Sequence, residues 1–331
     1  MKVLSLFSGI GAFEKALDNL EIPYELVAYC EIDKYASKSY AAIHSVSEEM
    51  NLGDITKVDA KKLPKDIDLL TYGFPCQDIS LAGKQKGLFN EDGSQTRSGL
   101  FFEALRIIEE TQPKVAIAEN VKNLTSKKFS EQFKIVLDSL EAAGYNNYWQ
   151  VLNAKDYGVP HNRERVFIVS IRKDVDTGTF KFPEGFPLEL RLKDVLEETV
   201  DSRFFLEKPF NQYDDGTCRT IKHQYYKNSY ANFIRTGDMG ATGVEVAKVI
   251  TVGNDALGNG TKLIENGSLR IRKLTPKECF RLMGFDDADF ERASAVNSNT
   301  QLYKQAGNSI VVPVLEHLVK AIAETEVWKG E

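Results

Sequence analysis

The segment F-S-G-I-G-A-F-E, at residues 7–14, is the most informative part of this sequence for the fold. A short apolar run, Val3–Phe7, leads into it, and an amphipathic helical pattern, Ala12–Leu20, follows it. Gly9 and Gly11 allow the backbone to turn tightly there and to approach a ligand closely. The stretch therefore predicts a strand, a tight turn and a helix, which open an α/β fold with a binding site at the turn.

The same alternation continues to about residue 173. Short apolar runs bounded by glycine, proline or charge predict strands at Val3–Phe7, Leu26–Glu31, Ile67–Tyr72, Val115–Glu119 and Val166–Ile171. Helical periodicity predicts helices at Ala12–Leu20, Lys34–Ile43, Leu100–Glu110 and Phe133–Ala142. Strands that alternate with helices indicate a mostly parallel sheet covered on both faces, with ligands bound beyond the carboxyl ends of its strands.

The pattern changes in the second half of the chain. Phe180–Pro187 contains two prolines and a glycine and suits a linker. Residues 237–260 carry six glycines, which predicts loops rather than a helix. Order returns at Thr275, which with Glu278 predicts a helix start with a capping box. A last helix is predicted from one apolar face, formed by Val314, Leu315, Leu318, Val319 and Ile322.

Composition indicates an ordinary folded protein. Of 331 residues, 42% are hydrophobic and 27% charged, which excludes disordered and collagen-like classes. The length exceeds that of a typical domain, about 100–200 residues, and predicts one large and one smaller domain. The net charge of −6 argues mildly against a nucleic-acid binder. Residues 1–60 hold five basic and ten acidic side chains, but residues 221–275 hold eight basic and four acidic, so a basic segment exists.

Targeting and metal signals are absent from the sequence. It has no apolar run of about 18 residues and no signal peptide, so we expect a cytoplasmic protein that does not interact with membranes. The four cysteines, at positions 30, 76, 218 and 279, lack the spacing of a zinc site, and no metal is expected.

Acidic residues after the predicted strands suggest a nucleoside site. Glu31 lies 20 residues beyond Gly11, where an acidic side chain can bind ribose hydroxyls. A dinucleotide site would want a third glycine where Glu14 stands, whereas S-adenosylmethionine has a ribose but no phosphate. Asp54, in the G-D-I turn, could accept from an adenine amino group. The alternative is a plain strand-to-helix turn with helix-capping acids.

Three segments place reactive or charged side chains at the same edge of the sheet. Cys76 follows the strand 67–72, and a thiolate there can be a nucleophile, although a single cysteine can also be a small buried hydrophobe. Glu119 ends the strand 115–119 and could be a general acid or an exposed strand-end acid. Arg163 and Arg165 alternate in an extended segment, so both could face one cleft or belong to a surface charge run.

These segments together resemble the bacterial cytosine-5 DNA methyltransferases of restriction–modification type. The similarity extends from about residue 3 to 325, with a poorly covered stretch from about 175 to 268. The matching segments, in family order, are F-S-G-I-G-A-F-E, E-I-D at 31–33, G-D-I at 53–55, G-F-P-C-Q at 73–77, R-S-G-L-F-F at 97–102, E-N-V at 119–121, Y-G-V-P-H-N-R-E-R at 157–165, R-K-L-T-P-K-E-C-F-R-L-M-G-F at 272–285 and Q-A-G-N-S-I at 305–310.

The resemblance implies a Rossmann-like, S-adenosylmethionine-dependent methyltransferase fold and a smaller, irregular, β-rich target recognition domain. It implies a catalytic domain at 1–178, a target recognition domain with hinge at 179–290, and a segment at 291–331 that returns to the catalytic domain. The implied partner is double-stranded DNA, and the implied product of the cofactor is S-adenosylhomocysteine. We expect a monomer encoded by a bacterium or a phage. Whether a cognate restriction endonuclease acts separately stays open.

The resemblance also implies a mechanism. The Cys76 thiolate would add to carbon 6 of a cytosine flipped out of the duplex, and Glu119 would hydrogen-bond or protonate ring nitrogen 3. Carbon 5 could then attack the methyl group of S-adenosylmethionine. Arg165 would hold the base oxygen, Arg163 would orient Cys76 or the base, and Asn120 would shape the pocket.

The resemblance assigns the cofactor to ten positions: Phe7, Gly9, Gly11, Glu31, Ile32, Asp54, Ile55, Pro75, Leu100 and Asn308. Two residues depart from the family pattern. Ile32 stands where members often carry an aromatic that stacks on adenine, and His161 stands where a glutamine is usual.

DNA contacts are implied for two regions. Residues 77–96 resemble the mobile loop that closes over DNA, although they could be an ordinary surface excursion. Thr251 and Val252 resemble the Thr-plus-aliphatic pair of the recognition domain, inside the basic segment. The candidate DNA-contacting residues are Gln77, Ser80, Lys84, Gln85, Arg97, Arg235, Lys248, Thr251, Val252 and Arg272.

Two other functions are compatible with the sequence. A close branch of the family methylates cytosine in tRNA, although the long recognition segment favours DNA. A catalytically inactive DNA-binding protein is the third hypothesis, and the intact Cys76, Glu119 and Arg165 argue against it.

Overall fold

A computed structural model of the chain describes residues 1–75, 88, 96–206, 218–219, 232–236, 249–251 and 270–328. The chain forms two compact units. Unit 1 consists of Met1–Asn153, Glu164–Glu184 and Val314–Glu331, and unit 2 consists of Ala154–Arg163 and Gly185–Pro313. Compactness alone assigns no function to a unit, so the functional boundaries 1–178, 179–290 and 291–331 remain predictions.

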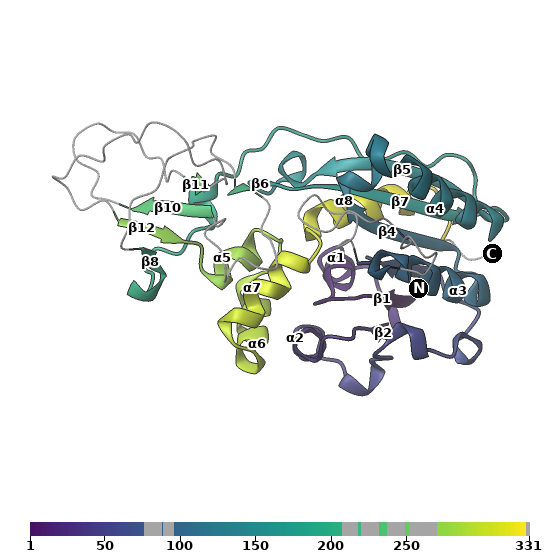
Figure 1. Ribbon diagram of the computed structural model, residues 1–331, viewed down its shortest axis with the longest axis horizontal. Coiled ribbons are helices and arrows are strands. Elements are labelled where there is room, and N and C mark those ends of the chain that lie inside the picture. Colours follow the sequence, from purple (N-terminus) through teal and green to yellow (C-terminus); the bar gives the residue numbers. More distant parts are fainter. Residues whose placement is uncertain are drawn as a thin grey trace. The chain divides into compact units, whose positions relative to one another are not determined.

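Unit 1 is built on a six-stranded sheet in the order β2-β1-β3-β4-β7-β5 (Figure 1). Its strands are β1 Lys2–Leu6, β2 Glu25–Cys30, β3 Leu69–Tyr72, β4 Val115–Val121, β5 Tyr145–Asn153 and β7 Glu164–Arg172. Neighbours from β2 to β4 pair in parallel, and β7 runs antiparallel to both β4 and β5. The predicted mostly parallel sheet is confirmed, but the segment predicted at Val166–Ile171 runs opposite to its neighbours.

Among the described residues, five helices belong wholly or mainly to unit 1: α1 Ala12–Asn19, α2 Lys34–His44, α3 Phe101–Thr111, α4 Ser130–Ala142 and α8 Val312–Ala323. All five agree with the predicted helices to within a few residues. Asp33 caps α2 by accepting from Tyr35 N, as expected for an aspartate before a helix. Short 3-10 turns in the chain lie at Glu48–Met50, Ile55–Lys57, Ala60–Lys62, Arg97–Leu100, Lys122–Thr125, Lys127–Phe129, Ala154–Tyr157, Leu192–Val195 and Ser202–Phe204.

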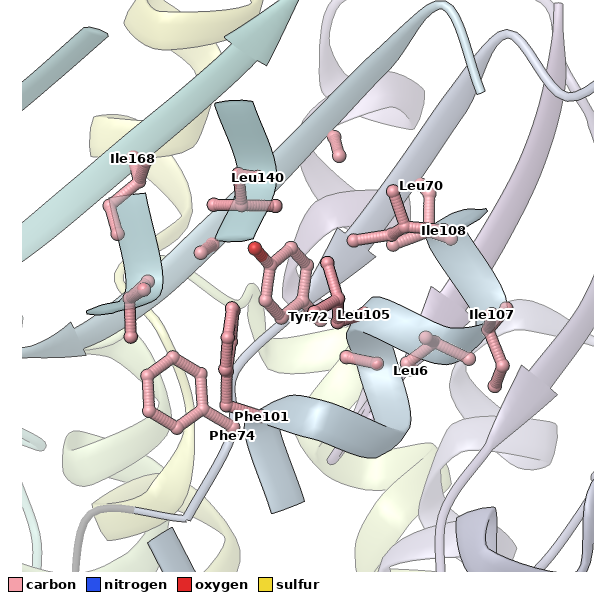
Figure 2. Packing of buried hydrophobic residues seen from close by; sticks show 14 of the residues in the cluster. Leu6, Leu70, Tyr72, Phe74, Phe101, Leu105, Ile107, Ile108, Leu140 and Ile168 are labelled. Atoms are coloured by element: carbon pink, nitrogen blue, oxygen red, sulfur yellow. The ribbon is translucent and has the colours of Figure 1, made fainter. Parts of the chain in front are cut away.

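A hydrophobic core supports the end of β3. Figure 2 shows Phe74 beside Phe101, with Tyr72 close by. The rings of Phe74 and Phe101 lie 5.6 Å apart and tilted, and those of Tyr72 and Phe74 lie 6.3 Å apart. Aromatic pairs at this separation attract one another in addition to burying apolar area. The segment that leaves β3, up to Pro75, is therefore anchored by packing.

Unit 2 contains an antiparallel sheet in the order β11-β10-β12-β8. Its strands are β8 Phe205–Leu206, β10 Asn232–Thr236, β11 Val249–Thr251 and β12 Arg270–Lys273, and β6 His161–Asn162 pairs with β9 Cys218–Arg219. Three helices follow, α5 Pro276–Arg281, α6 Asp287–Val296 and α7 Asn299–Asn308. The predicted capping box is confirmed, since Thr275 accepts from Glu278 N and Glu278 accepts from Thr275 N.

Among the described residues, one helical stretch is long and apolar enough to cross a membrane by length and composition alone. It comprises Asn299–Ala323, and 56% of its most apolar 18-residue segment is buried inside the protein. Helices in a protein core have the same character, so this stretch is weak evidence for a membrane span.

Candidate active site

Hydrogen bonds tie the glycine turn after β1 to the end of β2. Ser8 N donates to the Cys30 carbonyl at 3.1 Å, and Gly9 N donates to Glu31 Oε2 at 2.9 Å. The two glycines have different roles. A Cβ at Gly11 would lie 2.1 Å from His44 Nε2, whereas a Cβ at Gly9 would meet nothing within 4 Å. Gly11 is therefore required by packing, and Gly9 leaves an open face for a ligand.

Glu31 is held in place by two backbone donors. Oε1 accepts from Asp33 N at 2.7 Å while Oε2 accepts from Gly9 N. An ionised carboxylate offers about four lone-pair sites, and hydroxyl groups are suitable donors to it. The next side chain, Ile32, is 74% exposed. It offers an apolar surface against which a flat ring can pack.

Asp54 caps the 3-10 turn Ile55–Lys57. Its Oδ1 accepts from Thr56 N at 3.1 Å and from Thr56 Oγ1 at 2.8 Å. These hydrogen bonds lower the pKa of Asp54, so its carboxylate is a stable acceptor at neutral pH. Carboxylate acceptors, an exposed apolar side chain and the open face of Gly9 fit S-adenosylmethionine, and with Glu14 in place of a third glycine they do not fit a pyrophosphate.

The remaining cofactor candidates lie in both units. Phe7 has a left-handed backbone with a φ of 51°, and Ile55 is buried. Pro75 follows β3, and Leu100 ends the 3-10 turn before α3. Asn308 ends α7 in unit 2 and is exposed.

Glu119 and Arg165 form an ion pair at the end of β4. Because β7 is antiparallel to β4, Val121 pairs with Arg165 across the ladder. Arg165 Nε lies 2.9 Å from Glu119 Oε1, and the two side chains are 17% and 12% exposed. A carboxyl group and a guanidinium group this close can bind neighbouring ring atoms of one flat base.

Asn120 fastens the end of β4 to the segment that follows β3. Its side chain is buried; Nδ2 donates to the Phe74 carbonyl at 3.1 Å, and Oδ1 accepts from Val121 N at 2.8 Å. A Cβ at Gly73 would lie 3.6 Å from Glu119 Oε2. The chain just before Cys76 therefore runs against Glu119. Cys76 itself lies outside the described residues, as do Gln77, Ser80, Lys84 and Gln85.

Arg163 has a different partner from Arg165. It belongs to unit 2, is 3% exposed, and donates through Nη2 to the carbonyls of Gly307 at 3.2 Å and Ser309 at 2.7 Å. These carbonyls flank Asn308 at the end of α7. Arg165 belongs to unit 1, so a cleft shared by both arginines remains a prediction.

His161 is buried in unit 2. Its Nδ1 lies 3.1 Å from the Leu282 carbonyl, and its backbone N donates to Val159 at 2.6 Å. The imidazole therefore connects β6 to the end of α5, which gives it a structural partner within unit 2.

Three DNA-contact candidates lie in unit 2 strands, whose backbone pairing is described. Arg235 pairs with Ile271, Ile234 with Arg272, and Asn232 with Thr251. The backbone of Arg97 begins the 3-10 turn at Arg97–Leu100. Lys248 and Val252 lie outside the described residues.

Two other cysteines, Cys30 and Cys279, are buried in the protein interior. Cys30 is buried, and its Sγ donates to the Gly53 carbonyl at 3.1 Å. Burial raises the pKa of the Cys30 thiol to about 12, so it is protonated at neutral pH. Cys279 is also buried. Neither thiol has the environment of a nucleophile.

Comparison with known proteins gives one consistent result. The family model described as C-5 cytosine-specific DNA methylase matches residues 1–324. The chain is 37% identical to the type II methyltransferase M2.ScrFI of Lactococcus lactis subsp. cremoris, over 98% of this chain and 100% of that protein. It is 33% identical to the orphan methyltransferase M.SPRI of Bacillus phage SPR, over 99% of each chain. The structure of the Entamoeba histolytica methyltransferase EhMeth superposes with a TM-score of 0.71 at 18% identity, over 98% of both chains.

Proposed function

The chain belongs to the C-5 cytosine-specific DNA methylases, and we propose that Cys76, Glu119 and Arg165 carry out the chemistry of its reaction. The protein is a DNA (cytosine-5)-methyltransferase that depends on S-adenosylmethionine. S-adenosylmethionine, when bound, supplies the methyl group that carbon 5 receives. The target base is flipped out of the duplex, because Cys76 cannot reach carbon 6 of a stacked base.

The chain's own residues activate carbon 5. The Cys76 thiolate forms a bond to carbon 6, and the electron pair of the 5,6 double bond becomes available at carbon 5. Glu119 donates a hydrogen bond or a proton to ring nitrogen 3, and Arg165 donates to the neighbouring oxygen. After carbon 5 has been methylated, a base takes its proton, the electron pair of that bond re-forms the 5,6 double bond, and the sulfur–carbon bond breaks to release the Cys76 thiolate. A positioned acid such as Glu119 contributes about 10²–10⁴-fold to the rate.

The 2.9 Å ion pair between Glu119 and Arg165 carries this proposal. It places an acid and a cation side by side at the end of β4. Asn120 holds the Phe74 carbonyl against the same strand end. The segment up to Pro75 and the pair of Glu119 and Arg165 thus come together at the end of β4.

The cofactor would be held by the turns that follow β1 and β2. Glu31 would accept from ribose hydroxyls, Asp54 from the adenine amino group, and Ile32 would contact the adenine ring. Gly9 would leave room for the ligand, as its open face supports. Asn308 and the remaining candidates named above would complete the site.

We infer that DNA is bound by the loop at 77–96 and by the strands of unit 2. The basic balance of residues 221–275 supports this assignment, because phosphate contacts are made by Lys and Arg. The protein would work as a cytoplasmic monomer. Its relatives include both a type II and an orphan methyltransferase, so methylation is proposed without dependence on an endonuclease.

Transfer of a radioactive methyl group tests whether the substrate is duplex DNA or tRNA. Labelled S-adenosylmethionine would be incubated with duplex DNA and, in parallel, with tRNA. We expect label in the duplex only, and bisulfite sequencing should place the product at one cytosine of a short recurring sequence. Labelling of tRNA alone would contradict the proposal.

A further inference from the structure

The side chain of Asn51 connects the two acidic turns of the cofactor site. Asn51 lies just after the 3-10 turn Glu48–Met50, beside the end of β2, where it forms a bridge with Tyr29. Its Oδ1 accepts from Glu31 N at 3.0 Å, and its Nδ2 donates to the Glu31 carbonyl at 2.9 Å. One amide thus forms hydrogen bonds to both the backbone N–H and the backbone carbonyl of Glu31.

The same amide also forms hydrogen bonds to Gly53, in the turn that precedes Asp54, and to Ser37. Oδ1 also accepts from Gly53 N at 2.9 Å, and Nδ2 also donates to Ser37 Oγ at 3.0 Å. Gly53 has a φ of 72° and directly precedes Asp54. A primary amide can accept about two and donate about two hydrogen bonds, so Asn51 is fully used by the protein. It has no capacity left to bind a ligand itself.

The hydrogen bonds of Asn51 form part of a continuous network. Gly9 N donates to the Glu31 carboxylate, Asn51 holds the Glu31 backbone, and Asn51 also holds Gly53 before Asp54. On the far side, Ser37 Oγ lies 3.1 Å from the hydroxyl of the buried Tyr29. The network therefore joins the turns that would contact the amino acid end, the ribose and the adenine to buried residues of β2 and α2.

We propose that Asn51 is a positioning residue for S-adenosylmethionine, which sets the distance between Glu31 and Asp54. The inference rests on the proposed cofactor site. A carboxylate displaced by about 1 Å no longer meets its hydroxyl, so loss of Asn51 should weaken cofactor binding rather than the methyl-transfer step. Leu52 N still donates to the Tyr29 carbonyl at 2.7 Å, so the backbone bridge survives substitution.

Calorimetry on the full-length protein tests this. Asn51→Ala should weaken the affinity for S-adenosylmethionine and S-adenosylhomocysteine about tenfold, which is the loss of one or two ordering hydrogen bonds. It should raise KM for the cofactor and leave kcat at saturating cofactor within about twofold. Asn147→Ala is the matched control. Asn147 is also half-buried, donates to the Leu137 carbonyl at 3.2 Å and accepts from Ser170 Oγ at 2.7 Å, but it lies in β5.

Ser37→Ala is a second variant that tests the inference even if Asn51→Ala does not fold. It removes one of the four partners of Asn51 and should weaken cofactor binding about two- to threefold, non-additively with Asn51→Ala. If Asn51→Ala fails to fold, wild-type affinity in Ser37→Ala overturns the inference, and weakened affinity supports it. Wild-type affinity in folded Asn51→Ala, or an equal loss in Asn147→Ala, also overturns it. If the wild-type protein binds no cofactor, the proposed site itself is wrong.

Discussion

Arg165 Nε lies 2.9 Å from Glu119 Oε1 because β7 runs antiparallel to β4. Had β7 run parallel to β4, as β1, β2 and β3 do, its first residues would lie at the opposite edge of the sheet. The reversed strand therefore brings a cation to the carboxyl end of the sheet, where α/β folds bind ligands.

Replacing Glu119 tests the acid. Glu119→Gln keeps the size and one acceptor but removes the acidic proton, so the methyl-transfer rate should fall about 10²–10⁴-fold. The dissociation constant for S-adenosylmethionine should stay unchanged, because Glu119 lies at a different strand end from Glu31. Single-turnover methylation and calorimetry measure the two quantities. Glu164→Gln, at the neighbouring position in β7, is the control and should retain activity; a full rate in Glu119→Gln would contradict the assignment.

Asn120 should control the placement of the nucleophile. Asn120→Ala frees the Phe74 carbonyl, so Cys76 should sample more positions and bond formation to carbon 6 should slow about tenfold or more. Rapid-quench measurement of the covalent step gives the rate. An unchanged rate would show that packing of Phe74 against Phe101 alone suffices to hold the segment.

Arg163 should stabilise unit 2 and the end of α7. Arg163→Ala leaves the carbonyls of Gly307 and Ser309 without their donor, at a cost of about 2–4 kcal/mol in the free energy of unfolding. Asn308 lies between them, so cofactor affinity should fall as well. Urea unfolding and calorimetry measure the two effects. Arg163→Lys should restore part of the stability, since an ammonium can reach one carbonyl. A stable variant that has lost only DNA binding would contradict this role.

A second ion pair predicts a pH dependence of stability in unit 2. Arg281 binds Asp287 through two contacts of 2.7 Å, which, with Lys277, lowers the pKa of Asp287 from 3.8 to about 2. A lowered pKa stabilises the fold fully above about pH 4, and this contribution is lost as the pH falls towards 2. Asp287 is half exposed, so Asp287→Asn should cost about 1 kcal/mol at pH 7. The difference between wild type and variant in urea unfolding should shrink below pH 4; a difference that grows there would contradict it.

Much of the fold could be predicted because it follows from local chemistry. The glycine turn at Gly9 and Gly11, the aspartate cap at Asp33 and the capping box at Thr275 are each encoded within a few residues. The direction of β7 could not be predicted, since an apolar run has the same pattern in either direction. The sequence does not predict β5, because three asparagines and one glutamine interrupt the apolar residues of Y-N-N-Y-W-Q-V-L-N, as an edge strand allows.

The candidate site also contains residues that the sequence predicts and residues that it does not. The strand-end positions of Glu31 and Glu119 were predicted from the alternation of strands and helices. The partners of Arg163 were not, because they lie 144 and 146 residues further along the chain. Asn51 was missed because a single asparagine in a turn carries no pattern; only the four hydrogen bonds of its amide reveal its position between Glu31 and Gly53.

Covalent capture of DNA tests whether Cys76 is the nucleophile. Fluorine at carbon 5 cannot leave as the proton does, so the bond between Cys76 and carbon 6 should persist in duplex DNA that carries 5-fluorocytosine at the methylated position. With S-adenosylmethionine, the wild-type protein should form an adduct that survives denaturing electrophoresis, and Cys76→Ala should form none. No adduct on DNA that the wild-type protein methylates, or an unchanged adduct with Cys76→Ala, would show that Cys76 does not form the bond to carbon 6.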